Sequence, residues 1–308
     1  MRLALLVLLL VLVAAGSMQV ARRWDAEMDR KGCRDFSADL LPPPAPGGER
    51  VSFVAIGDTG NANATQAAVA RAVARHCAAA GCDFGLLLGD NFYPDGVSSV
   101  NDPLFGRAFE AELARIGLPF YPVLGNHDIH QGGGAYQALY SLKNPLWRMP
   151  NLSYRFRRGP AAFYALNSNC SAMALMKLED WLAEAAPGWR IVFAHHTLYA
   201  SGKRKGRDRA YRWYWENGFD GRVDFYLSGH NHWLEHLAPP GGPDYIVSGA
   251  GSDPTRIKGP VWGEGSAVKS RFRHTGAGFV WLSLSAREAR VQFLDTEGRV
   301  LHEFTRTR

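Results

Sequence analysis

The sequence predicts an α/β protein in which two mixed β-sheets pack as a sandwich flanked by helices. Before Asn151, apolar β-like runs alternate with helical segments, which is typical of parallel strands joined by crossover helices. After Asn151, short strands separated by turns favour antiparallel pairing. With the N-terminal segment set aside, about 260 residues remain, which fits one α/β domain.

Periodicity and turn residues place the individual elements. Apolar runs predict strands over 51–56, 84–88, 119–124, 190–194 and 222–227. Helical spacing predicts helices over 65–80, 103–116 and 172–185. Thr65 is the expected cap of the first helix and Gly81 its stop. Two antiparallel strands are expected around the turn at Gly159 and Pro160, and the tail is expected to be a run of strands.

The chain divides into three expected parts. Residues 1–20 have the pattern of a signal peptide, because Arg2 precedes an apolar run and small residues follow it. An apolar stretch of about 18 residues also suits an uncleaved N-terminal anchor, and a membrane contact is expected only in that case. We favour export with cleavage, to a periplasmic, secreted or lumenal location. Residues 21–49 form a Pro-rich arm and linker, and residues 50–308 form the catalytic domain.

Four cysteines in an exported chain permit disulfides, and four allow three pairings. The short spacing between Cys77 and Cys82 favours a local loop, which leaves Cys33 with Cys170. None of the four has the CxxC spacing of a zinc site, so a structural role is expected.

The formal charge of +6 and the pI of 9.2 fit an anionic substrate. Nucleic acid is not an expected partner, because no aromatic stacking pattern accompanies the basic run at 203–207. No dedicated protein partner is evident from the sequence.

Five short polar strings each follow an expected apolar strand. They are Gly57-Asp58-Thr59-Gly60, Gly89-Asp90-Asn91-Phe92-Tyr93, Gly125-Asn126-His127-Asp128, His195-His196 and Gly229-His230-Asn231-His232. Because open α/β sheets place their sites at the C-terminal ends of the strands, we expect these side chains to meet there. Glycine before a ligand allows the sharp turn and close approach that a crowded metal centre requires.

The ligand types in these strings suit two metal ions. A ferric ion prefers anionic oxygen ligands, which Asp58, Asp90 and the Tyr93 phenolate supply, and His232 completes that set. A divalent ion, either Fe, Zn or Mn, suits the amide and imidazole ligands, with Asp90 bridging. The ligands of this second ion are Asn126, His195 and His230. Such a site is net positive and attracts phosphate oxygens.

These motifs resemble those of the calcineurin-like metallophosphoesterases. The string Gly89 to Tyr93, with its tyrosine, resembles the purple acid phosphatases of the tartrate-resistant type, and the likeness runs from Val51 to the C-terminus. The resemblance implies the metallophosphoesterase fold, Fe(III) plus a divalent metal on the ligands named above, and hydrolysis of phosphate monoesters by direct attack of a metal-bound hydroxide. It also implies that His127, oriented by Asp128, protonates the leaving group.

The fourth motif departs from the family in having two histidines. Alignment makes His195 the ligand, while His196 is either the ligand or its neighbour. The expected substrate is a small phosphorylated molecule, and the residues expected to bind it are Asn91, His196, Lys203 and Lys205. A basic run such as 203–207 is also typical of a solvated face.

Three alternatives stay open at this point. The same metals suit a phosphodiesterase or a nucleotide hydrolase, and a pair of iron ions suits redox chemistry. A non-catalytic binding protein that keeps the fold belongs to another class, and such a protein would be expected to lack ligands that are all present here.

Overall fold

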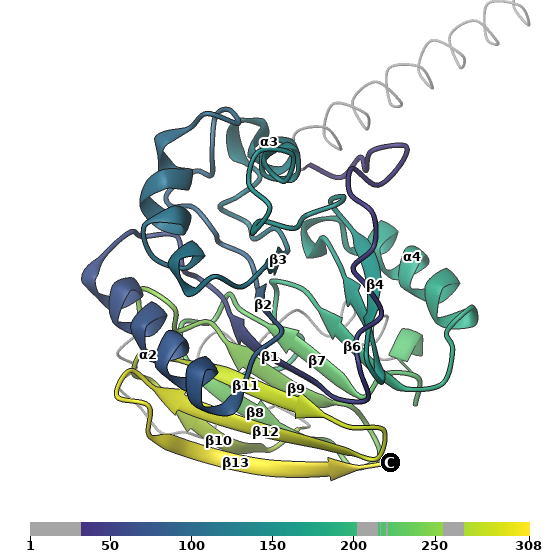
Figure 1. Ribbon diagram of the computed structural model, residues 1–308. Coiled ribbons are helices and arrows are strands. Elements are labelled where there is room, and N and C mark those ends of the chain that lie inside the picture. The colour runs from purple at the N-terminus through teal and green to yellow at the C-terminus, as the bar shows by residue number, and fades with distance from the viewer. Residues whose placement is uncertain (1–31, 202–214, 216, 220, 255–267) are drawn as a thin grey trace, which may run out of the picture.

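The computed structural model describes residues 32–201, 215, 217–219, 221–254 and 268–308. Two β-sheets lie face to face, with helix α2 over the six-stranded sheet and helix α4 over the outer face of the seven-stranded sheet (Figure 1). The expected fold class is confirmed. The predicted signal peptide or anchor of residues 1–20 lies outside the described residues. Among the helices that are described, none is long and apolar enough to cross a membrane.

The six-stranded sheet has the order β13-β12-β11-β1-β2-β3. The first three strands along the chain run parallel to one another, and the last three are antiparallel neighbours that complete the sheet. Its strands are β1 (Val51–Ile56), β2 (Phe84–Leu87), β3 (Phe120–Pro122), β11 (Gly278–Leu284), β12 (Glu288–Asp295) and β13 (Val300–Thr307).

The seven-stranded sheet has the order β10-β8-β9-β7-β6-β5-β4. Four neighbouring strands, β5, β6, β7 and β9, are parallel, and the remaining three pair antiparallel. Its strands are β4 (Tyr154–Arg158), β5 (Ala161–Ala165), β6 (Trp189–Phe193), β7 (Phe225–Ser228), β8 (Leu234–Leu237), β9 (Asp244–Ser248) and β10 (Ser270–His274). Strands β8 and β10 are not among the elements predicted from the sequence.

The helices differ from the prediction in two places. Helix α2 (Ala64–Ala80) is capped by Asn63, whose side chain accepts from the Gln66 N–H, so the prediction of Thr65 as cap is wrong. The helix expected over 103–116 is broken into a π-helical turn, η1 (Phe105–Glu110), and a 3₁₀ turn, η2 (Ala114–Ile116). The remaining helical elements are η3 (His130–Gly132), α3 (Gly133–Tyr140), η4 (Ser168–Cys170) and α4 (Ser171–Ala183).

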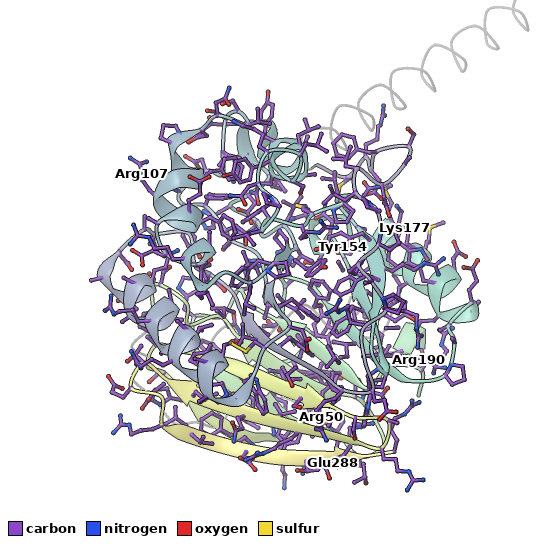
Figure 2. The ribbon with its side chains drawn as sticks, viewed as in Figure 1. Arg50, Arg107, Tyr154, Lys177, Arg190 and Glu288 are labelled. Carbon is purple, nitrogen blue, oxygen red and sulfur yellow. A yellow bond between two sulfur atoms is a disulfide. The ribbon has the colours of Figure 1, made fainter. Side chains whose placement is uncertain are left out.

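Alternation along β5 shows how the layers are built. Ala161 and Phe163 belong to the core between the sheets, whereas Ala162 and Tyr164 pack with the buried face of α4. This period of two follows from the strand geometry, which points successive side chains to opposite faces. Side chains fill the space between the sheets, and Tyr154 lies there with its hydroxyl donating to the Pro122 carbonyl (Figure 2).

The described part of the arm, residues 32–49, runs beside β4 (Figure 1). Hydrogen bonds join the arm to the domain, including one from the Gly159 N–H to the Pro46 carbonyl. The pairing of Cys33 with Cys170 and of Cys77 with Cys82 is confirmed. Lys177 of α4 also forms an ion pair with Asp35 of the arm.

Candidate metal centre

Polar side chains from five strand ends meet at one edge of the sandwich. The strings follow β1, β2 and β3 of one sheet and β6 and β7 of the other, so parallel strands bring residues that are far apart in the sequence to the same place. Asp58, Asp90 and His195 are buried, and each offers a ligand atom within 4.8 Å of the others. This triad is therefore a candidate metal site.

An oxygen-rich group forms one side of the centre. The Tyr93 hydroxyl lies 3.1 Å from Oδ1 of Asp58 and 3.1 Å from Oδ2 of Asp90. Nε2 of His232 lies 3.2 Å from the same Asp58 oxygen and 3.4 Å from the Tyr93 hydroxyl. Two carboxylates, a phenol and an imidazole thus face one small volume.

A nitrogen-rich group forms the other side. Nε2 of His195 lies 3.3 Å from Oδ2 of Asp90, 3.2 Å from Oδ1 of Asn126 and 3.1 Å from Nδ1 of His230. Oδ2 of Asp90 therefore contacts both groups. Nδ1 of His195 faces the Leu88 carbonyl at 2.9 Å, which leaves Nε2 for the centre.

The backbone at the centre is strained. Asp58, Asp90 and His230 have φ values of 57°, 51° and 65°, in the left-handed region that residues other than glycine rarely adopt. Gly125 is required beside them, because a Cβ there would collide with the Asp90 carboxylate. Strain of this kind persists where the surrounding structure holds it, and it is typical of functional sites.

The electrostatics of the centre favour a cation. Burial and the neighbouring Asp58 and Asp90 carboxylates raise the pKa of Tyr93 above its usual range. Burial raises the pKa of Asp58, and although burial alone would lower that of His195, Asp90 raises it to about 9. These groups hold protons because negative charges crowd a buried space, and a metal ion would take the place of those protons.

His127 lies at the rim, and its orientation differs from the prediction. Its backbone N–H donates to Oδ1 of Asp90 at 3.0 Å, and its ring lies 4.8 Å from the Tyr93 ring. Nδ1 of His127 faces the Pro94 carbonyl rather than Asp128. The prediction that Asp128 orients His127 is therefore wrong, and the orienting group is a backbone carbonyl.

Asp128 is instead a buried scaffold residue. Its carboxylate accepts hydrogen bonds from the backbone N–H groups of Asn91 (3.0 Å), Phe92 (3.1 Å) and Gly125 (2.8 Å). Burial and the nearby Asp90 carboxylate raise its pKa to about 6. Because Asp128 is fully buried, a direct catalytic role is not supported by its position.

Asn91 is also turned away from any substrate. Its side-chain N–H groups donate to the Val123 carbonyl at 2.9 Å, to Oε1 of Gln137 at 3.1 Å and to Asp128 at 3.3 Å. These contacts lie in the buried interior, so Asn91 fixes its neighbours, and its position does not support the prediction of a substrate-binding residue.

The doubled histidine separates into two environments. His195 reaches Asp90 and Asn126, whereas Nδ1 of His196 lies 2.9 Å from the Ser168 hydroxyl. The His196 ring still lies 4.8 Å from the His230 ring, so it borders the centre. Lys203 and Lys205, the other predicted substrate-binding residues, lie outside the described residues.

Sequence reasoning missed Gln137 of α3. This residue is fully buried, and its Nε2 donates to Asp128 at 2.9 Å while its Oε1 accepts from Asn91. It thereby joins the loops of the second and third strings. A single glutamine between Tyr136 and Ala138 carries no signal of this role, because its partners come from distant parts of the sequence.

Comparison with known proteins identifies the family. Residues 51–234 match the calcineurin-like phosphoesterase family. The chain belongs to that family. The expected enzyme class, a hydrolase of phosphoric esters, follows from this membership, and the match spans all five strings that bring this phosphoesterase's polar side chains together.

Curated relatives place the likeness more narrowly. Purple acid phosphatase 3 of Arabidopsis thaliana is 29% identical to this phosphoesterase over 297 residues, covering 87% of this chain and 80% of the relative. Human tartrate-resistant acid phosphatase type 5 is 28% identical over 310 residues, covering 86% of this chain and 94% of the relative. The resemblance to purple and tartrate-resistant acid phosphatases is confirmed.

Solved structures share the fold of this phosphoesterase. GAP50, described as the anchor in the inner membrane complex of Plasmodium, has a TM-score of 0.70 at 24% identity, covering 84% of this chain and 89% of that one. Purple acid phosphatase PPD1 from yellow lupin seeds has a TM-score of 0.66 at 19% identity, covering 86% and 55%. An anchor protein and a phosphatase share this fold, so the fold alone does not decide the function. The function has to be argued from the residues of the site.

Proposed function

We propose that this chain is a binuclear-metal acid phosphatase that hydrolyses phosphate monoesters. The observation that carries the proposal is the Tyr93 hydroxyl, which lies 3.1 Å from a carboxylate oxygen of both Asp58 and Asp90. A phenol between two buried carboxylates is costly unless a highly charged cation balances the ionised groups. That arrangement favours a ferric ion, which binds phenolate and carboxylate oxygens well.

The donor set divides between two ions. Asp58, Asp90, Tyr93 and His232 would hold Fe(III), since three of the four are anionic oxygen ligands. The divalent ion, which is Fe, Zn or Mn, would be held by Asp90, Asn126, His195 and His230. Oδ2 of Asp90 contacts members of both sets, so this carboxylate supports a bridging position.

The two ions, when bound, would supply an activated water molecule and would neutralise phosphate oxygens. The side chains of the protein would orient the substrate and deliver the proton to the leaving group. Since Nδ1 of His127 faces the Pro94 carbonyl, that nitrogen donates its proton there and Nε2 is left for the substrate. Nε2 of His127 can then deliver a proton to the leaving alkoxide. No covalent phosphoenzyme is required, and no nucleophilic Ser or Cys is needed.

The two disulfides support the remainder of the proposal. Disulfides persist in oxidising compartments, so export of the chain is proposed, with residues 1–20 as the signal. Two further parts of the proposal do not depend on the disulfides. Lys203 and Lys205 are proposed to contact the substrate, and residues 50–308 are proposed to form the catalytic domain.

The test is a visible absorption spectrum with metal analysis on the oxidised protein. We expect two metals per chain and a tyrosinate-to-iron band that disappears in Tyr93→Phe but persists in Tyr121→Phe, a matched change at a buried tyrosine of the core. A colourless protein with two manganese or zinc ions would overturn the ferric assignment. Faster hydrolysis of diesters than of monoesters would overturn the substrate class and favour a phosphodiesterase.

A further inference from the structure

A second polar cavity lies at the other end of β8 from the metal centre. It has a volume of about 400 Å³ and is lined by His236, Asp244, Arg271, His302, Arg306 and the loop 238–242 among others. His232 precedes β8 and this loop follows it, so the four residues of β8, about 13 Å of strand, lie between the two sites. The proposed phosphatase mechanism makes no use of this cavity.

A chain of hydrogen bonds runs along the wall of the cavity. Oδ1 of Asp244 lies 2.9 Å from Nε2 of His236, and Nδ1 of His236 lies 3.0 Å from Nε2 of His302. His236 is buried with only 2% of its surface exposed. Both ring nitrogens of this buried side chain thus have hydrogen-bond partners, as buried polar atoms require.

With both rings neutral, the chain of hydrogen bonds sets the tautomer of each. The ionised carboxylate of Asp244 only accepts, so Nε2 of His236 carries the proton and its Nδ1 accepts from Nε2 of His302. Nδ1 of the neutral His302 is then a lone pair, and among the described residues it has no hydrogen-bond partner. His302 therefore presents an acceptor that can take up a proton.

Two guanidinium groups line the same cavity. Arg306 is held in place, since its Nη1 donates to Oδ2 of Asp244 at 2.9 Å and to the Gly242 carbonyl at 3.2 Å. Arg271 is an exposed residue that lines the cavity, and it forms no hydrogen bond or ion pair within the part of the chain that the structure describes. An unpaired cation beside an unpaired imidazole nitrogen is a pattern that recognises an oxyanion.

The other charged groups near the cavity are already engaged. Asp244 is the first residue of β9 and Asp224 directly precedes β7, and both face Arg306. Glu235 of β8 is bonded to Ser201, and Arg273 of β10 also donates to Ser201. Burial, and after it the neighbouring His236 and Arg271, lower the pKa of His302 to about 4. A bound anion would offset the positive charge of Arg271 and favour the protonated ring.

We propose that this cavity is a second binding site for a phosphate-type oxyanion, held by Arg271 and Arg306 and by His302, which takes up a proton from solvent as the anion binds. The anion is either free orthophosphate or the phosphoryl group of a larger molecule, because both present the same oxygens. The proposal goes beyond the catalytic function, since it involves none of the metal-centre residues.

Equilibrium dialysis of the holoenzyme with orthophosphate tests the proposal. We expect one binding site that Arg271→Ala weakens by at least about tenfold, as expected when a charge-assisted contact is lost. Lys269→Ala is the matched control, because it removes a positive charge from an exposed position two residues away that does not line the cavity. Equal binding by the wild type and Arg271→Ala would overturn the proposal.

A second variant tests the role of His302. His302→Phe keeps a ring to stack on Phe272 but removes the acceptor. With sulfate, whose charge is constant between pH 5 and pH 7, we expect affinity for the Arg271-dependent site to rise as the pH falls, and this dependence to vanish in His302→Phe. Unchanged pH dependence in the variant would overturn the role of His302.

Two further arms separate the possible outcomes. If methylphosphonate binds to the cavity as tightly as orthophosphate, the natural ligand is the phosphoryl group of a larger molecule. If methylphosphonate does not bind, the natural ligand is free orthophosphate. Removal of the metals is expected to leave the Arg271-dependent site intact. If every phosphate site disappears with the metals, this inference fails while the proposed phosphatase function stands.

Discussion

Nε2 of Gln137 donates a hydrogen bond of 2.9 Å to Oδ1 of Asp128 in the fully buried interior behind the metal centre. The same glutamine accepts from Asn91, so one side chain joins the loop that carries Asp90 to the loop that carries Asn126. The spacing of the two loops therefore depends on a residue outside all five strings.

Gln137→Met tests this relationship. The methionine fills a similar volume but cannot bond, so Asp128 and Asn91 each lose a partner, and we expect the free energy of unfolding to fall by about 1–3 kcal/mol. Urea unfolding measures the change. Gln131→Met is the matched control, because that glutamine is exposed. A Gln137→Met protein as stable as the wild type would show that the network contributes nothing.

The doubled histidine gives a second prediction. His195→Ala should lose the divalent metal, because Nε2 of His195 lies between Asp90 and Asn126. His196→Ala should keep both metals, since Nδ1 of His196 faces Ser168. Metal content per chain after dialysis measures both variants. Metal loss in His196→Ala alone would reverse the assignment of the ligand.

The cap of α2 gives a third prediction. Asn63→Ala removes the side-chain oxygen that accepts from the Gln66 N–H, and we expect a loss of about 1 kcal/mol in the free energy of unfolding. Thr65→Ala, the change at the cap expected from sequence, should have little effect because Thr65 lies inside the helix. Thermal unfolding of the two variants compares them directly, and a larger effect at Thr65 would contradict the assignment.

The two disulfides should differ in their contribution to stability. Cys33 and Cys170 are 137 residues apart, whereas Cys77 and Cys82 are 5 apart. On the loop-closure estimate, replacing the long-range pair by serines costs about 5 kcal/mol and replacing the local pair about 2 kcal/mol. Denaturant unfolding of the two double variants checks this order. Equal losses would indicate that chain entropy is not the main contribution.

The pH dependence of stability should reflect His302. Burial, and after it the neighbouring His236 and Arg271, lower its pKa from an ordinary 6.5 to about 4. Between these values the unfolded chain binds a proton that the folded protein does not, so the free energy of unfolding falls as the pH drops through this window. His302→Phe should show a flatter dependence than the wild type in urea unfolding without added phosphate. An identical slope would contradict the lowered pKa.

The sequence predicts the sandwich and the meeting of the five strings well. Each of Asp58, Asp90, Asn126, His195 and His230 follows an apolar strand within a few residues, and parallel pairing then brings the strand ends together. These signals are local, since a glycine, a ligand and an apolar run stand next to one another in the chain.

Other features depend on partners that are distant in the sequence. The carboxylate of Asp128 turns inward because backbone N–H groups from two loops converge on it. The residues next to Asp128 in the sequence do not indicate this orientation. Strand β8 has four residues and directly follows the last string, so its apolar signal is too short to recognise. The break in the helix expected after Pro103 places Phe105 and Phe109 against Trp147, a contact made across the fold.

The arm beside β4 has a consequence for solubility. Strand β4 is the last strand of its sheet, and such a strand offers unpaired N–H and C=O groups to other molecules. The Pro46 carbonyl of the arm accepts a hydrogen bond from the Gly159 N–H, and the Asp35 carboxylate accepts one from the Ser153 N–H. The prolines of the arm have no N–H, so they cannot extend the hydrogen-bond ladder of the sheet to another strand. The segment thus closes one border of the sheet against aggregation, and shortening the chain to its catalytic core would reopen that border.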